Sequence, residues 1–83
     1  MELVIEAAAL KALLRMPRAE ALALRAKLTT FANDPYARHP WAKAFTAGIG
    51  RIRQGDWRAV YRIEADRLIV VIVKIGNRRE VYR

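Results

Sequence analysis

The chain has 83 residues, which is enough for one small domain, and we predict a single domain over residues 1–83. Lys and Arg number 16 against 8 Asp and Glu, so the formal net charge is +8. This excess favours a polyanionic partner such as a nucleic acid, although solubility or an acidic protein partner would also account for it. Cysteine is absent, which excludes disulfides and thiolate chemistry and favours a reducing cytoplasm. The longest apolar run, residues 68–73, is far shorter than the roughly 20 residues of a membrane-spanning helix, so we expect no membrane span.

The first 33 residues predict a short strand followed by two helices. Residues 3–5 are apolar and β-branched in part, as in a short strand. Residues 6–15 contain leucines at the i, i+3, i+4 spacing of one helical face, namely Leu10, Leu13 and Leu14. A second helix is predicted from Pro17, which suits the first helical position, to Asn33. Its apolar residues are Ala21, Leu22, Leu24, Ala26, Leu28 and Phe31. We therefore expect an αα-hairpin whose apolar side chains form one side of the core.

Residues 34–48 predict a linker loop. Asp34 and Pro35 end the second helix, and the following residues show neither a helical nor a strand period. His39 has no cysteine, carboxylate or second histidine at ligand spacing, so the sequence predicts neither a metal site nor a catalytic base there. Trp41 and Phe45 are expected to pack onto the core rather than to stack on bases.

From Gly50 onward the period changes to two, which predicts strands. Residues 57–63 form the return strand of a hairpin whose turn is Gln54-Gly55-Asp56. Residues 68–73 are apolar on both faces, as in a central strand, and residues 78–83 are expected to form a short edge strand or a tail. The predicted fold is therefore α+β, with a short N-terminal strand and an αα-hairpin packed on a small antiparallel sheet in the order β-α-α-β-β-β.

The predicted hairpin brings arginines together. Arg51 and Arg53 are two residues apart and project from one face of their strand, while Arg58 lies across the turn on the partner strand. Like charges in neighbouring strands destabilise a sheet, so a purely structural sheet rarely places them together, although each arginine could simply point to solvent. Arginine presents a planar fork of donors that fits phosphate oxygens. We therefore expect this strand pair to bind a nucleic-acid backbone.

Two segments resemble a known protein family. Residues 50–61, GRIRQGDWRAVY, and residues 76–83, GNRREVYR, are similar to the RelE branch of the RelE/ParE toxin superfamily of bacterial toxin–antitoxin modules. The order of predicted elements and the break at Asp34-Pro35 match that branch too, so the resemblance covers essentially the whole chain.

The resemblance implies a ribosome-dependent endoribonuclease that cleaves mRNA by attack of a 2′-hydroxyl on the scissile phosphate. It implies no metal and no cofactor. A cognate antitoxin would inhibit the protein, in a hetero-oligomeric complex that binds DNA through the antitoxin. The catalytic residues by this resemblance are Arg51, Arg53, Arg58, Arg78 and Tyr82. The residues expected to contact RNA are Arg51, Arg53, Arg58, Asn77, Arg79 and Arg83.

Some positions depart from the pattern of the RelE branch. Many members have lysine where Arg51 and Arg53 stand and histidine where Asn77 stands, so groups able to transfer a proton are missing here. Tyr82 could take part in proton transfer, stack on a base, or orient the nucleophile, and the sequence leaves all three roles open. Two other functions also stay open: a ParE-like inhibitor of DNA gyrase, and a catalytically weak antitoxin-binding partner that acts in autorepression of their operon.

Overall fold

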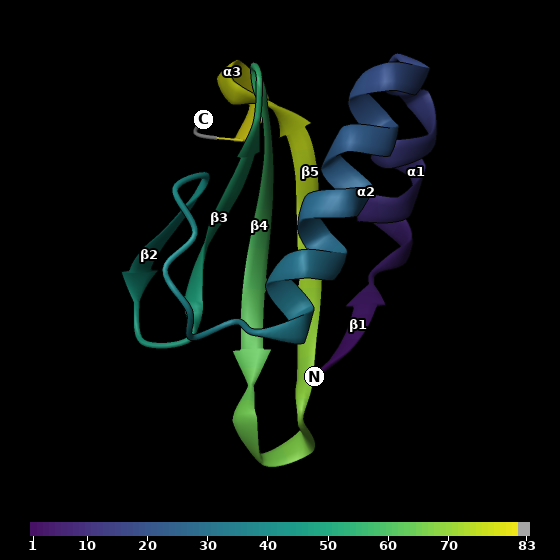
Figure 1. Ribbon diagram of the computed structural model, residues 1–83. Helices are drawn as coiled ribbons and strands as arrows, with labels where there is room; N and C mark the ends of the chain where they lie inside the picture. Colours follow the sequence, from purple (N-terminus) through teal and green to yellow (C-terminus); the bar gives the residue numbers. More distant parts are fainter. Residues whose placement is uncertain (82–83) are drawn as a thin grey trace.

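A computed structural model describes the backbone of residues 1–81 and the side chains of residues 1–79. Two helices lie against a sheet, and a short third helix follows the last strand (Figure 1). The elements are β1 (Glu2–Ile5), α1 (Ala7–Arg15), α2 (Arg18–Asn33), β2 (Ala42–Thr46), β3 (Ile49–Gln54), β4 (Trp57–Glu64), the 3-10 turn η1 (Ala65–Arg67), β5 (Ile69–Asn77) and α3 (Arg78–Val81). In the described residues no helix is long and apolar enough to cross a membrane.

The sheet of the described residues has five strands in the order β1-β5-β4-β3-β2. The predicted α+β class is confirmed, but the sheet is mixed rather than wholly antiparallel, because β1 pairs in parallel with β5. Parallel neighbours need a long connection, which here comprises both helices and the three other strands. A local sequence pattern carries no information on strand direction, and the direction of β1 was therefore not predictable from residues 2–5 alone.

Strand β2 corrects the prediction that residues 34–48 form only a linker loop. It pairs with β3 at the edge of the sheet, with Lys43 opposite Arg51. Four of its five residues are exposed, so no buried alternation marks it in the sequence. Phe45 is 51% exposed on this strand, and the prediction that it packs onto the core is wrong. Trp41, just before β2, does pack against the core as predicted.

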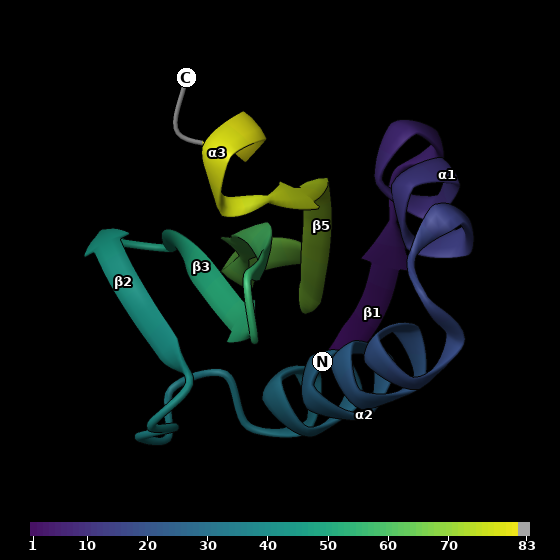
Figure 2. The same ribbon diagram turned by 90° about the horizontal axis from the view of Figure 1, so that it is seen from above.

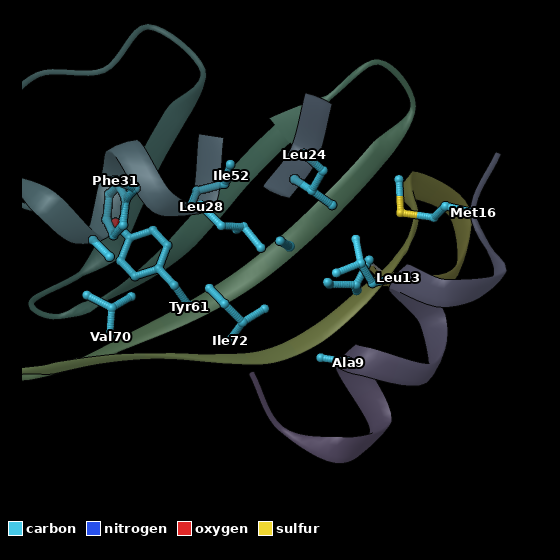
Figure 3. Packing of buried hydrophobic residues seen from close by; sticks show 13 residues of the cluster. Ala9, Leu13, Met16, Leu24, Leu28, Phe31, Ile52, Tyr61, Val70 and Ile72 are labelled. Carbon is cyan, nitrogen blue, oxygen red and sulfur yellow. The ribbon is translucent and has the colours of Figure 1, made fainter. Parts of the chain in front are cut away.

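The main core lies between α2 and one face of the sheet (Figure 3). Leu24, Leu28 and Phe31 recur along α2 at the helical spacing and are almost fully buried. They pack with side chains from three strands: Ile52 of β3, Ala59 and Tyr61 of β4, and Val70, Ile72 and Ile75 of β5. Leu22 of α2 faces solvent, contrary to the prediction.

Helix α1 buries only one of the three leucines predicted to face the core, Leu13. Ala9 and Leu13 are buried, whereas Leu10 and Leu14 are 39% and 73% exposed. The three leucines fit a helical stripe equally well, but the short α1 turns the Ala9 and Leu13 side toward the core. The alanines gave no signal because their burial contributes little hydrophobic area.

A bulge between β4 and β5 sets which side chains of β5 face the core. Tyr61 lies opposite Ile72 and Val60 lies opposite Lys74, so β5 has one extra residue between these pairs, Val73. The bulge lets Ile72 and the later core residues of β5 lie on the same face of the sheet, and it places Lys74 on the other face.

Residues 78–81 form the short helix α3, so the predicted edge strand or tail is wrong there. Figure 2 shows α3 on the opposite side of the sheet from α2. The Asn77 side chain accepts a hydrogen bond from the Arg79 amide at 3.3 Å, as an N-cap residue does. The Arg78 amide donates to the Asp56 carbonyl at 2.7 Å and so joins the start of α3 to the β3–β4 turn.

Candidate nucleic-acid interface

Six basic side chains lie on the face of the sheet that α2 leaves open. Cross-strand partners in a sheet point to the same side. One row runs from Lys43 through Arg51 and Val60 to Lys74, and the next pairs Arg53 with Arg58. Ile52 and Ala59, which alternate with these residues along β3 and β4, are fully buried against α2, so the two rows face the other way. The sixth, Arg62, lies opposite Ile49 on the same side and forms ion pairs with Glu6 and Glu64. We call the other five the basic face: Lys43, Arg51, Arg53, Arg58 and Lys74.

Arg53 and Arg58 are directly opposite each other in neighbouring strands. Such a like-charge pair is unfavourable by a few tenths of a kcal/mol to about 1 kcal/mol. The ion pairs of the described side chains join Arg62 or Arg67 to the carboxylates of Glu6 and Glu64 at 3.4–3.9 Å. None of them includes a residue of the basic face. The charge of this face is therefore available to an external anion.

Two hydrogen bonds, one from the segment before β2 and one from α2, fix the backbone of β3 at Arg53. Its amide donates to the Trp41 carbonyl at 2.8 Å, and its carbonyl accepts from the Lys27 ammonium at 2.9 Å. Strand β2 begins only at Ala42, so the Lys27 side chain occupies the place of the next ladder donor. Desolvation lowers the pKa of Lys27, and the nearby positive charge of Arg53 lowers it further. Sequence reasoning missed Lys27, because a single lysine on a helix gives no signal of a contact with a strand 26 residues away.

The β3–β4 turn is held from both faces of the sheet. The Arg58 guanidinium donates from Nη1 to the Gly55 carbonyl at 2.6 Å and to the Trp57 carbonyl at 3.0 Å. Gly55 has φ of 57°, which glycine adopts without strain. On the α2 side, the Gln54 amide donates to Glu20 at 3.3 Å. These contacts restrict the conformations of the turn, and with them the position of Arg58.

The structure brings together part of the predicted site. Arg51, Arg53 and Arg58 share one face, as predicted. Arg78 and Arg79 are exposed at the start of α3, and the Arg78 amide donates a hydrogen bond to the β3–β4 turn. The Asn77 side chain caps α3, and Asn77 pairs with Trp57 in the row of core-side residues rather than in the rows of the basic face.

The remaining two predicted site residues, Tyr82 and Arg83, lie outside the described residues. In the described part of the chain no three His, Asp or Glu side chains lie close enough together to hold a metal ion. The arrangement that the structure shows is thus a set of permanently charged donors on a flat sheet face, suited to binding phosphate oxygens by charge and hydrogen bonds.

The fold and the basic face define a class of protein. Over 98% of the chain, the structure matches the isolated RelE toxin of E. coli with a TM-score of 0.77 and 23% identity, covering 89% of that chain. It matches the archaeal RelE–RelB complex of Pyrococcus horikoshii OT3 with a TM-score of 0.75 and 22% identity, covering 93% of each chain. The toxin–antitoxin complex RelBE2 of Mycobacterium tuberculosis gives a TM-score of 0.74 and 21% identity, covering 92% of this chain and 95% of that one. The protein therefore has the fold of the RelE/ParE toxins.

The sequence assigns the family within this class. Residues 3–82 match the profile of the family described as ParE toxin of type II toxin–antitoxin system, parDE. The chain therefore belongs to this family, and it is the toxin of a type II toxin–antitoxin module. No curated protein shows a significant similarity to the sequence.

Proposed function

We propose that this toxin is a ribosome-dependent endoribonuclease that cleaves mRNA in the cytoplasm. The observation that supports this most is the direct opposition of Arg53 and Arg58, neither of which takes part in any of the described ion pairs. A sheet tolerates such a pair at a cost in stability, and a bound phosphate would offset that cost. Arg51 extends the same face by one more guanidinium group.

The chemistry would be an internal phosphoryl transfer within the RNA. The 2′-oxygen attacks the adjacent phosphorus, the bond to the 5′-oxygen breaks, and the products end in a 2′,3′-cyclic phosphate and a 5′-hydroxyl. Arg51, Arg53 and Arg58 would bind the non-bridging oxygens and stabilise the negative charge that develops on them. A preorganised donor of this kind is typically worth about 10²–10³ in rate.

Arginine is a poor base because its pKa is above about 12, so the arginines would not remove the 2′-proton. Within the described residues, the basic face holds only arginines and lysines. We propose that Tyr82, or a group of the ribosome, takes the 2′-proton, and that Arg78 stabilises the departing 5′-oxygen. Arg79, Arg83 and Asn77 would contact the RNA on either side of the scissile bond.

The protein partner that we propose is the cognate antitoxin of the module. RelE relatives have been solved as complexes with RelB. An acidic or amphipathic segment of the antitoxin would cover the basic face and keep RNA from it.

A second candidate function is inhibition of DNA gyrase. It is favoured by the family description, which names ParE. In that case the basic face would contact a protein. Transcripts would then stay intact with the wild type and with every variant of the basic-face arginines. A third outcome, no growth arrest at all, would indicate a toxin that serves only as antitoxin partner.

The test is induction of the toxin without antitoxin, with new 5′ ends on translated transcripts mapped by primer extension. Arg58→Ala and Arg78→Ala are the informative variants. Arg25→Ala is the matched control, because Arg25 is exposed on α2 and forms none of the described ion pairs. We expect codon-phased cuts with the wild type and with Arg25→Ala, and their loss in the other two. Cuts that persist in both site variants would refute the proposal, and growth arrest with DNA damage but no cuts would favour gyrase inhibition.

A further inference from the structure

A cavity of about 430 Å³ opens on the α2 side of the sheet, behind the basic face. It lies where α2 ends: Phe31 closes one end, and the segment from Pro35 to His39 covers one side. The floor is the sheet itself, contributed by alternate residues of the edge strand β2 and by Tyr61 of β4. Its volume falls in the range of small-molecule sites, about 300–1,000 Å³.

The Tyr61 hydroxyl is an unused polar group at this cavity. Tyr61 is only 4% exposed and packs against Phe31 with ring centroids 4.4 Å apart. Burial raises the pKa of Tyr61, so the hydroxyl stays protonated at neutral pH. Among the described residues it has no hydrogen-bond partner, yet it is not sealed from solvent, and Tyr61 lines the cavity. The hydroxyl can therefore bond to water, and a ligand that reached it would replace that bond by a directed one.

Gly50 allows the Tyr61 ring to lie in this position. Gly50 is the cross-strand neighbour of both Tyr61 and Ala44. A Cβ atom at residue 50 would overlap the Tyr61 hydroxyl and the Lys43 carbonyl. The Tyr61 ring thus lies over Gly50, with its hydroxyl directed toward the edge strand β2.

The wall opposite the sheet is ordered by its own hydrogen bonds. The Asp34 carbonyl accepts from the Ala37 amide at 3.3 Å and from Nε2 of His39 at 2.8 Å. The His39 ring also stacks on Trp41, with centroids 4.7 Å apart and planes at 25°. Tyr36, in the same wall, is 68% exposed and offers a further aromatic ring. A preformed wall of this kind lowers the entropy cost of binding a flat ligand.

We propose that this cavity binds a single unpaired nucleobase of RNA. The Tyr61 hydroxyl would bond to the edge of the base, Tyr36 and His39 would provide ring surface, and the exposed Arg38 would contact the attached phosphate. Stacking on aromatic side chains together with contacts to the base edge is the usual way in which proteins hold unpaired RNA bases. No residue that lines the cavity is acidic, and the chain carries a net charge of +8, which favours an anionic ligand. The proposal rests on the proposed function, since it assigns a subsite for the same RNA.

The position of β2 connects the cavity to the basic face. Because β2 is an edge strand, both faces of the sheet meet along it. Lys43 lies on the basic face opposite Arg51, while its neighbours Ala42 and Ala44 line the cavity. A single RNA strand that crosses this edge can therefore have its phosphates on one face and one base in the cavity on the other.

The probe for this site is adenosine 5′-monophosphate (AMP), titrated into the ¹⁵N-labelled full chain and followed by NMR. We expect saturable shifts of amides around the cavity, such as that of Gly48, and weaker binding of ribose 5-phosphate, which lacks the base. Tyr61→Phe should weaken AMP binding about 2- to 12-fold, as expected for one hydrogen bond. Ala44→Leu, which fills the cavity, should abolish it. Arg25→Ala, at an exposed position on α2, should not change it.

Equal affinity for AMP and ribose 5-phosphate would overturn the proposal, since the base would then contribute nothing. Unchanged AMP affinity in both Tyr61→Phe and Ala44→Leu would also overturn it. A thermal melt of each variant shows whether it is folded, and the two variants act by different means, so failure of one to fold leaves the other to decide. The titration does not depend on cleavage. If the proposed nuclease function is wrong, the primer-extension experiment shows it. If the proposed base site is wrong, the titration shows it.

Discussion

Replacing Arg53 by glutamine is expected to stabilise the protein and to weaken its toxicity. Arg53 lies directly opposite Arg58, so the substitution removes a like-charge pair while keeping a polar side chain. The anchoring contacts of residue 53 are unaffected, because the bonds to Trp41 and Lys27 use its main-chain amide and carbonyl. Toxicity should fall because the substitution removes one of the charged hydrogen-bond donors that we propose for the RNA phosphate.

The expected gain in stability follows from removing the repulsion between the two opposed arginines. Removing a directly opposed like-charge pair is worth about 0.2–1 kcal/mol. In a domain of 60–100 residues, 1 kcal/mol shifts the Tm by about 4–8 °C, so a rise of about 1–8 °C is expected for Arg53→Gln. The gain should shrink at high salt, because the screening length falls from about 10 Å at 0.1 M to about 3 Å at 1 M ionic strength.

The assay is thermal denaturation of the wild type, Arg53→Gln and Arg25→Gln at low and high salt. Arg25→Gln lowers the net charge by the same amount, but Arg25 is on α2, away from the sheet. The difference between the two variants therefore isolates the pair from the overall charge. If Arg53→Gln is less stable than Arg25→Gln at low salt, the two guanidinium groups do not repel each other and the reasoning is wrong.

Three further predictions concern single residues. Leu28→Ala, at a fully buried position, should lower the free energy of unfolding by about 2–5 kcal/mol in chemical denaturation, and a cost below 1 kcal/mol would contradict the assigned core. Lys27→Met should cost about 1 kcal/mol by leaving the Arg53 carbonyl without its donor, whereas Lys11→Met, at an exposed position on α1, should cost less, and equal costs would argue against that contact. Because desolvation raises the pKa of Tyr61 above its ordinary 10.0, the unfolded phenol loses its proton at a lower pH than the folded one, so the wild type should lose stability relative to Tyr61→Phe as the pH rises above 10.0. Parallel Tm curves for these two proteins between pH 8 and 11 would show that Tyr61 does not titrate differently in the folded state.

The central hairpin could be predicted from the sequence because its signals are local. The period of two, the turn residues and the arginine spacing all lie within residues 50–63, and the observed pairing of Arg53 with Arg58 follows from them directly. The long apolar run that follows was predicted as a central strand for the same reason, and β5 has a neighbour on both sides.

The parts that the sequence did not reveal depend on distant residues. Strand β2 is almost wholly exposed, so its identity comes from pairing with β3 and not from its own pattern. The buried side of α1 is set by how the helix packs against β5, and Ala9 rather than Leu10 lies on that side. The cavity at Tyr61 arises where the end of α2, a loop and two strands, β2 and β4, meet, and no single segment carries a signal for it.

The contacts that hold β3 in place also bear on how the basic face would work. Lys27 and Glu20, both on α2, reach β3 and its turn from the core side, while Arg58 and the Arg78 amide hold the turn from β4 and α3. A sheet that only had to be stable would gain by losing the opposition of Arg53 and Arg58. Instead, the surrounding contacts fix the backbone at Arg53, and two hydrogen bonds to turn carbonyls hold the Arg58 side chain. Preorganised charge of this kind lowers the reorganisation needed when a phosphate binds. Substitutions at Lys27 or Glu20 should therefore slow the proposed RNA cleavage even where the protein stays folded, although neither residue lies on the basic face.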